Sequence, residues 1–270
     1  MSMLPVSFSA PASSESQNED ALRVGPGLAV VVDGAGVEPR FRAGCVHSVA
    51  WFANQLADAM LRHLSDRSQS PREALARSIS HVREQHGPQC HLADGSPSAT
   101  IAAFRVNGDR LEHLVQCDAA VLLVRTDGSS ELVTDRMIEE ASAKVGQHRE
   151  ELRARNLPEE TVAEMGEAYL ERLRNDPAGF WIPQDDPAVA DHALAGSTPV
   201  AELRAVVACS DGSTRALDRL GLHEVDSLAC AAVEQPLEDL VTAIRTAEAD
   251  GRERPGKLHD DATVAVLHLG

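Results

Sequence analysis

The chain has 270 residues, of which 43% are hydrophobic and only 3% are aromatic, so its core must be built from Ala, Val and Leu. A formal net charge of -17 argues against a nucleic-acid backbone or an anionic membrane as the main partner. Five unevenly spaced cysteines and the lack of a long apolar run are typical of a soluble, cytoplasmic protein with reduced thiols, and we expect one here.

The beginning of the chain is rich in Ser, Ala and Pro. This composition predicts a flexible N-terminal arm over residues 1–15, followed by a single domain over residues 16–270. Glu19-Asp20 lies soon after the arm, and by itself it is an ordinary polar turn.

Acidic residues stand at the ends of three predicted strands. Asp33 follows the apolar run 29–32, Asp211 follows the run 205–209, and Asp260-Asp261 precede the run that ends at Leu269. A single Asp-Gly after a strand is most simply a turn. Three such ends can instead converge on a site for Mg²⁺ or Mn²⁺, because these metals prefer oxygen ligands and a cation relieves the repulsion between carboxylates.

The elements between these strand ends follow from apolar periodicity and turn residues. We expect helices over residues 47–64, from Ser70-Pro71 onward, and over 225–233 and 236–249. Strands at 98–106, 111–115, 119–125 and 131–134 are expected to form one antiparallel meander, with Asn107-Gly108 as a hairpin turn. The charged, helix-favouring composition of residues 137–198 predicts a flap inserted between core strands.

Several cysteines and histidines could suggest zinc, because thiolate and imidazole suit that metal. They are Cys45, His47, His86, Cys90 and His91. Their spacing matches no common structural zinc motif, so we interpret them as buried thiols and as packed or exposed histidines.

The acidic motifs, taken in chain order with one Ser-rich motif, resemble those of the PP2C family of metal-dependent protein Ser/Thr phosphatases. The motifs are Asn18-Glu19-Asp20, Asp33-Gly34-Ala35-Gly36, Ser96-Pro97-Ser98-Ala99-Thr100, Asp118, Ser210-Asp211-Gly212 and Asp260-Asp261-Ala262-Thr263. The resemblance runs from Asn18 to Leu269 and suggests a divergent bacterial branch with a role in signalling. It implies an α+β fold, a four-layer α-β-β-α sandwich with two central antiparallel sheets flanked by helices.

The resemblance also implies a set of ligands for two Mg²⁺ or Mn²⁺ ions. Asp33 would bridge both ions, and Asp211 and Asp260 would complete the ligands of one. Glu19 and the backbone carbonyl of Gly34 would hold the other. Asp33, Asp211 and Asp260 are therefore the expected catalytic residues.

Three further acidic positions have roles by the same resemblance. Asp118, together with Asp211, would hold a third ion, as in some members of the family. Asp20 would orient a bound water. Asp261 would cap or orient the mouth of its strand.

The expected phosphate-binding Arg is missing, since Ser14-Glu15-Ser16 occupy its neighbourhood. Arg40 or Arg42, on the loop after Asp33, could replace it, because a guanidinium matches the geometry of a phosphate. The simpler interpretation is that both are exposed loop charges.

The implied reaction is single-step hydrolysis of phosphoserine or phosphothreonine in a phosphorylated protein substrate, by a metal-activated water and without a Ser, Cys or His nucleophile. The alternative is a weakly active or inactive relative that uses the same fold to bind a partner. The complete set of carboxylates favours the enzyme, and the missing Arg favours the alternative.

Overall fold

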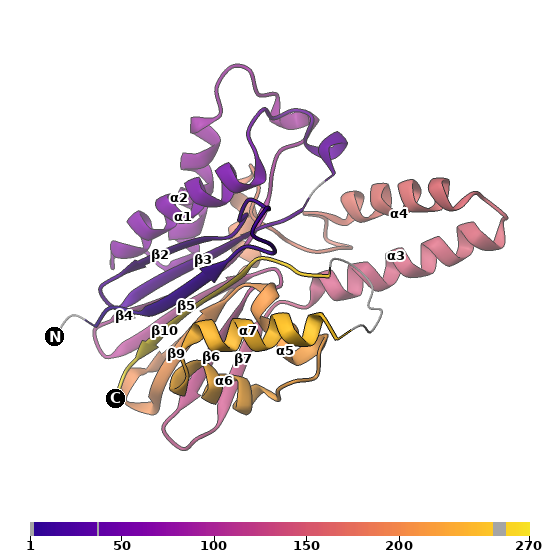
Figure 1. Ribbon diagram of the computed structural model, residues 1–270. Coiled ribbons are helices and arrows are strands. Elements are labelled where there is room, and N and C mark those ends of the chain that lie inside the picture. The colour runs from indigo at the N-terminus through magenta and orange to yellow at the C-terminus, as the bar shows by residue number, and fades with distance from the viewer. Residues whose placement is uncertain (1–2, 37, 251–257) are drawn as a thin grey trace.

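Two five-stranded antiparallel sheets, stacked face to face, form the centre of the protein (Figure 1). The structure is a computed structural model that describes residues 3–36, 38–250 and 258–270. One sheet has the order β1 (Val6–Ala10), β10 (Ala262–His268), β9 (Leu203–Cys209), β6 (Ala120–Arg125), β7 (Ser130–Thr134). The other has the order β2 (Ala21–Gly25), β3 (Leu28–Gly34), β4 (Ala99–Asn107), β5 (Arg110–Gln116), β8 (Leu194–Pro199).

Helices cover the outer face of each sheet (Figure 1). The β2–β8 sheet carries α1 (Val49–Ser65), α2 (Pro71–Gln85) and the short η3 (Pro187–His192). The β1–β7 sheet carries α5 (Asp211–Asp218), α6 (Val225–Glu234) and α7 (Leu237–Glu248). The four-layer α-β-β-α sandwich that the resemblance implied is therefore confirmed.

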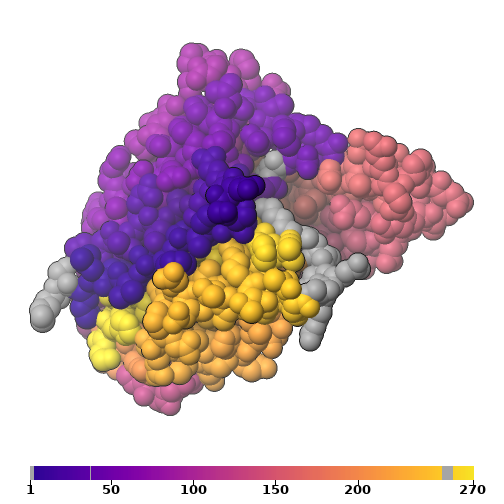
Figure 2. All heavy atoms as spheres, in the orientation of Figure 1, coloured from indigo at the N-terminus to yellow at the C-terminus, as the bar shows by residue number. Residues whose placement is uncertain are grey.

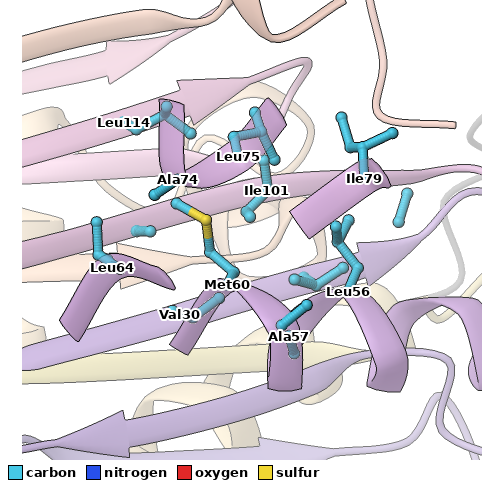
Figure 3. Packing of buried hydrophobic residues seen from close by; sticks show 14 of the residues in the cluster. Val30, Leu56, Ala57, Met60, Leu64, Ala74, Leu75, Ile79, Ile101 and Leu114 are labelled. Atoms are coloured by element: carbon cyan, nitrogen blue, oxygen red, sulfur yellow. The ribbon is translucent and has the colours of Figure 1, made fainter. Parts of the chain in front are cut away.

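Strand β3 shows how the sequence builds this sandwich. Its apolar run is buried on both faces, because successive side chains of a strand point to opposite sides. Val30 and Val32 pack against the helical layer, and Ala29 and Val31 pack against the other sheet. Figure 3 shows the helical side of this core, where Met60 of α1 lies among side chains of α2, β3 and β4.

The structure corrects two expectations about the strands. Residues 6–10, predicted to lie in a flexible arm, form β1 and pair with β10 in register Val6↔Val266. The predicted meander is divided between the sheets, since β4 and β5 pair in one sheet while β6 and β7 pair in the other. The chain crosses between them at Cys117, whose φ of 63° turns the backbone out of the first sheet.

Residues 137–198 begin with two helices, α3 (Met137–Ala154) and α4 (Glu159–Leu173), which form a helical arm that extends away from the sandwich. Figure 2 shows this arm as a separate lobe on one side of the molecule. The end of the segment is not part of the arm, because residues 194–198 belong to β8 and extend the sheet beyond β5. No helix in the described part of the chain is long and apolar enough to cross a membrane.

Candidate metal centre

Asp33 lies at the end of β3, beside the acidic segment that precedes β2. The next residue is Gly34, where an added Cβ would lie 2.5 Å from Cγ1 of Val49 and 2.9 Å from the carbonyl oxygen of Glu19. Only glycine therefore lets the strand end this close to its neighbour. The Gly34 N–H donates to that same carbonyl across 3.2 Å, which holds Glu19 and Asp20 next to Asp33.

A second close approach joins Asp211 to the Asp260-Asp261 pair. Helix α5 begins at Asp211, and a Cβ on the next residue, Gly212, would lie 1.9 Å from the carbonyl oxygen of Asp261. Strands β9 and β10 are antiparallel neighbours, with Val264 opposite Cys209, so the acidic ends of both strands meet at one edge of the sheet.

Four half-buried or buried carboxyl groups influence one another here. Burial raises the pKa of Asp33 well above its usual range, and the charges of Asp20, Asp211 and Asp118 add to the shift. Burial likewise raises the pKa of Asp20 and of Asp118 to about 7. Asp33 and Asp211 also lie within hydrogen-bonding contact. When these carboxyl groups are ionised they repel one another, and a bound cation would offset that repulsion.

The polar contacts around Asp20 and Asp261 differ in kind. The Ser210 hydroxyl donates to Oδ2 of Asp20 across 2.8 Å, whereas Oδ1 of Asp20 is buried without a hydrogen-bond partner. A buried, unsatisfied carboxylate oxygen calls for a water or a cation. Asp261 instead accepts from the backbone N–H groups of Ala12, at 2.7 Å, and Glu19, at 2.6 Å, and so fastens the N-terminal segment to the site.

Asp260 lies against a cation. Its Oδ2 accepts from Nη2 of Arg215 across 2.7 Å, and Arg215 also pairs with Glu248 at 2.9 Å. The side chains of Arg215 and Glu248 are 4% and 3% exposed. Of the predicted ligands, the structure thus brings Asp33, Asp118 and Asp211 together, while Asp260 has a protein partner of opposite charge.

The two arginines proposed for phosphate binding lie on η1 (Pro39–Arg42), in the loop after Asp33. The guanidinium of Arg40 pairs with Glu167 and, at 3.6 Å, with Glu164, both on α4. In this structure Arg40 therefore connects the loop to the helical arm. Arg42 ends the same short helix, and its role in phosphate binding stays a prediction.

A cavity of about 420 Å³ opens beside the carboxylates. Its lining includes Asp118 and Asp211 together with three arginines, Arg136, Arg215 and Arg219. Sequence reasoning missed these three arginines because they lie in α5 or at the ends of α3 and α5, whose orientation depends on the fold. Arg215 is paired with Asp260 and Glu248, whereas the positive charge of Arg136 and Arg219 is of the kind that attracts a phosphate.

Comparison with known proteins places this geometry in context. The model of the family described as protein phosphatase 2C matches residues 11–252. No curated protein sequence matches the chain significantly.

Solved structures share the fold at low sequence identity. The serine/threonine phosphatase PstP/Ppp of Mycobacterium tuberculosis is 17% identical, with a TM-score of 0.55 and 98% of each chain covered. PppA, a regulatory component of T6SS in Pseudomonas aeruginosa, is 18% identical, with a TM-score of 0.58, and the match covers 99% of this chain and 98% of that one. The PstP catalytic domain in complex with two manganese ions is 19% identical, with a TM-score of 0.55 and 98% of each chain covered. Because the family match spans most of the sequence, the chain belongs to the protein phosphatase 2C family.

Proposed function

We propose that this protein is a metal-dependent phosphomonoester hydrolase that removes phosphate from phosphoserine and phosphothreonine of proteins. The observation that carries the proposal is the convergence of four carboxyl groups, from Asp20, Asp33, Asp118 and Asp211, beside a cavity that also contains arginines. Membership of the phosphatase family supports it, as does the manganese complex of the structurally similar PstP domain.

The residues at this site fit Mg²⁺ or Mn²⁺. All the proposed donors are oxygens, all but one of them belong to carboxyl groups, and one buried oxygen of the neighbouring Asp20 has no hydrogen-bond partner. The proposed ligands of two ions are Asp33, Asp211, Asp260, Glu19 and the carbonyl of Gly34. When bound, the metals would lower the pKa of a water and offset the charge of the phosphoryl oxygens.

Asp118 and Asp260 differ from the other proposed ligands in their surroundings. Asp118 lies beside Asp211, which fits the proposed place of a third ion. Asp260 already accepts from Arg215, but an ionised carboxylate has about four acceptor positions. We therefore propose that Arg215 orients Asp260 and leaves acceptor capacity for a metal.

Other residues near the proposed metal ligands would position the substrate and the water. Asp20, held by the Ser210 hydroxyl, would accept a hydrogen bond from the bound water. Arg136 and Arg219 line the cavity and would attract the phosphate. Because Arg136 directly precedes α3, the helical arm begins at the rim of the cavity, and we propose that residues 137–198 of this single domain govern access of the protein substrate.

The test is hydrolysis of para-nitrophenyl phosphate and of a phosphothreonine peptide in Mn²⁺, before and after chelation. Wild type and Asp127→Asn, which changes an exposed turn residue, should both turn over, whereas Asp33→Asn and Asp211→Asn should lose at least about 100-fold in kcat. Activity that survives chelation, or that persists in both site variants, would refute the proposed mechanism.

One observation favours the alternative of a weakly active or inactive binding protein. Arg215 neutralises Asp260, a ligand that the family reaction uses. Wild type that binds Mn²⁺ but hydrolyses neither substrate would support this alternative.

A further inference from the structure

A second group of metal-ligating side chains contains no carboxylate. The ligand atoms of Cys45, His47, His86 and Cys90 all lie within 4.8 Å of one another, and no other group of three or more such residues in the described segments meets this distance. Cys45 and His47 come just before α1, and His86 and Cys90 come just after α2. The fold thus brings together two short pairs, Cys-x-His and His-x₃-Cys, whose separation in sequence hides them.

The distances fit a tetrahedral metal. The two sulfurs are 3.8 Å apart, Cys45 Sγ lies 3.5 Å from His47 Nδ1 and 3.4 Å from His86 Nδ1, and Cys90 Sγ lies 3.5 Å from His47 Nδ1. Zinc–sulfur bonds of about 2.3 Å and zinc–nitrogen bonds of about 2.0–2.1 Å place sulfurs ~3.8 Å apart, and sulfur and nitrogen ~3.6 Å apart, in a regular tetrahedron.

A disulfide does not account for these contacts, and hydrogen bonds to sulfur would stabilise them only weakly. A disulfide requires sulfurs about 2.05 Å apart, far closer than the two sulfurs here. A thiol is a weak donor and its sulfur is a weak acceptor, so hydrogen bonds alone would hold Cys45 Sγ only weakly against two imidazoles and a second sulfur. One cation would satisfy all four ligand atoms together.

The surrounding structure holds the ligands in place without a metal. The His47 ring stacks on Trp51, with centroids 3.8 Å apart, and the His86 ring meets Trp51 edge-on at 5.0 Å. The backbones also interlock, since the His91 N–H donates to the Gly44 carbonyl at 2.6 Å. A Cβ on Gly44 would lie 2.1 Å from the carbonyl oxygen of His91, so only glycine permits this approach.

We propose that Cys45, His47, His86 and Cys90 bind one zinc ion in a structural Cys₂His₂ site that ties the start of α1 to the end of α2. On binding, both thiols would release their protons to solvent and both imidazoles would bind as neutral rings. Four protein ligands leave no position for a substrate, which is the arrangement of a structural site.

The position of the site suggests what the zinc would stabilise. The loop that it anchors leads from Asp33 and Gly34, and contains Arg40, which pairs with α4 of the helical arm. The same loop also packs closely against the backbone of Gly95. A Cβ on Gly95 would lie 2.0 Å from the carbonyl oxygen of Phe41. Zinc would thus hold the connection between the carboxylates and the arm.

The test measures zinc directly and does not depend on phosphatase activity. The full chain, expressed with zinc in the medium and purified in excess Mg²⁺ without chelator, should contain about one zinc per chain by elemental mass spectrometry. Cys230→Ser, which changes an exposed thiol, should keep the zinc, and the double variant Cys45→Ser/Cys90→Ser should lose it. Zinc retained by the double variant, or absent from wild type even after incubation with Zn²⁺, would overturn the proposal.

A second measurement covers the case in which the double variant does not fold. Co²⁺ introduced into wild type should give the sulfur-to-metal charge-transfer and intense visible bands of a tetrahedral thiolate site. His47→Gln should weaken these bands, and His91→Gln should leave them unchanged. Octahedral cobalt bands alone, or a wild-type mass lower by two hydrogens because Cys45 and Cys90 form a disulfide, would contradict the proposal.

Discussion

Nη2 of Arg215 donates to Oδ2 of Asp260 across 2.7 Å, although the two residues are 45 positions apart in the sequence. The same guanidinium pairs with Glu248, and Glu248 in turn accepts from Arg245 at 3.1 Å and lies 2.6 Å from Nδ1 of His259. This network joins α5, α7 and the segment before β10. It fixes the position of Asp260 before any metal binds.

Replacing Arg215 should therefore destabilise the protein strongly. Arg215→Ala leaves Asp260 without its cation, whereas Glu248 keeps Arg245 and His259, so we expect a loss of about 1–3 kcal/mol, the cost of buried polar groups that lose a partner. Thermal and urea unfolding would measure the loss. The matched control is Arg204→Ala, whose exposed pair with Glu234 should contribute little to stability, because water and salt screen exposed ion pairs. Equal effects of the two substitutions would show that the buried network does not stabilise the fold.

Metal-free protein should lose stability as the pH rises from about 4 to about 7. The folded-state pKa of Asp118 is raised to about 7 by burial, above its unfolded value of 3.8, so the folded state binds more protons in this window. The stabilisation is complete below the unfolded pKa and is lost as the pH rises through the folded pKa.

Asp118→Asn should reduce this pH dependence. At pH 8 the variant should raise the metal-free unfolding free energy by on the order of 1 kcal/mol, because it removes one charge from the cluster. Mn²⁺ should stabilise wild type more than the variant. Asp127→Asn, at an exposed turn, serves as the control, and a wild-type melting temperature that does not change between pH 5 and pH 8 would contradict the prediction.

Gly212→Ala should disturb both the fold and the metal centre. The added Cβ would lie 1.9 Å from the carbonyl oxygen of Asp261, so α5 or the start of β10 must shift, at a cost of about 1–3 kcal/mol. Mn²⁺ affinity by calorimetry should fall together with stability. Gly146→Ala offers the contrast, because its site on α3 has nothing within 4 Å and a helical Gly→Ala change stabilises by about 1 kcal/mol.

Arg136→Ala should raise KM for a phosphomonoester more than it lowers kcat. Arg136 lines the cavity beside Asp118 and Asp211 and is 62% exposed, so its loss removes attraction for the phosphate and little packing. We expect a several-fold increase in KM, which corresponds to about 1 kcal/mol. Arg155→Ala, at the other end of α3, should behave as wild type, and an unchanged KM in Arg136→Ala would exclude Arg136 from phosphate binding.

Local sequence patterns were sufficient to predict most elements of this protein. The apolar run before Asp33 predicted β3, and the Ser70-Pro71 pair predicted α2, which begins with the expected cap and a reciprocal bond to Glu73. These signals work because strand burial, helix periodicity and capping depend on neighbours within a few residues. The acidic strand ends were visible for the same reason, and their order along the chain matched a family.

Only the tertiary structure decided which of these pieces meet. The crossing at Cys117 separates β5 from β6, and the pairing of residues 6–10 with β10 needs a partner about 250 residues away. Long-range packing likewise placed Arg215 against Asp260, where no sequence spacing indicates an ion pair.

The Cys45–His47 and His86–Cys90 pairs show the same limit most clearly. Each pair is too short and too ordinary to indicate a site, and the sequence alone favoured packed thiols and histidines. The antiparallel packing of α1 and α2 brings the beginning of one helix to the end of the other, and so places all four ligand atoms within 4.8 Å. The sequence thus supplies the four residue types that can bind zinc, whereas their relative positions depend on how two helices pack on a sheet.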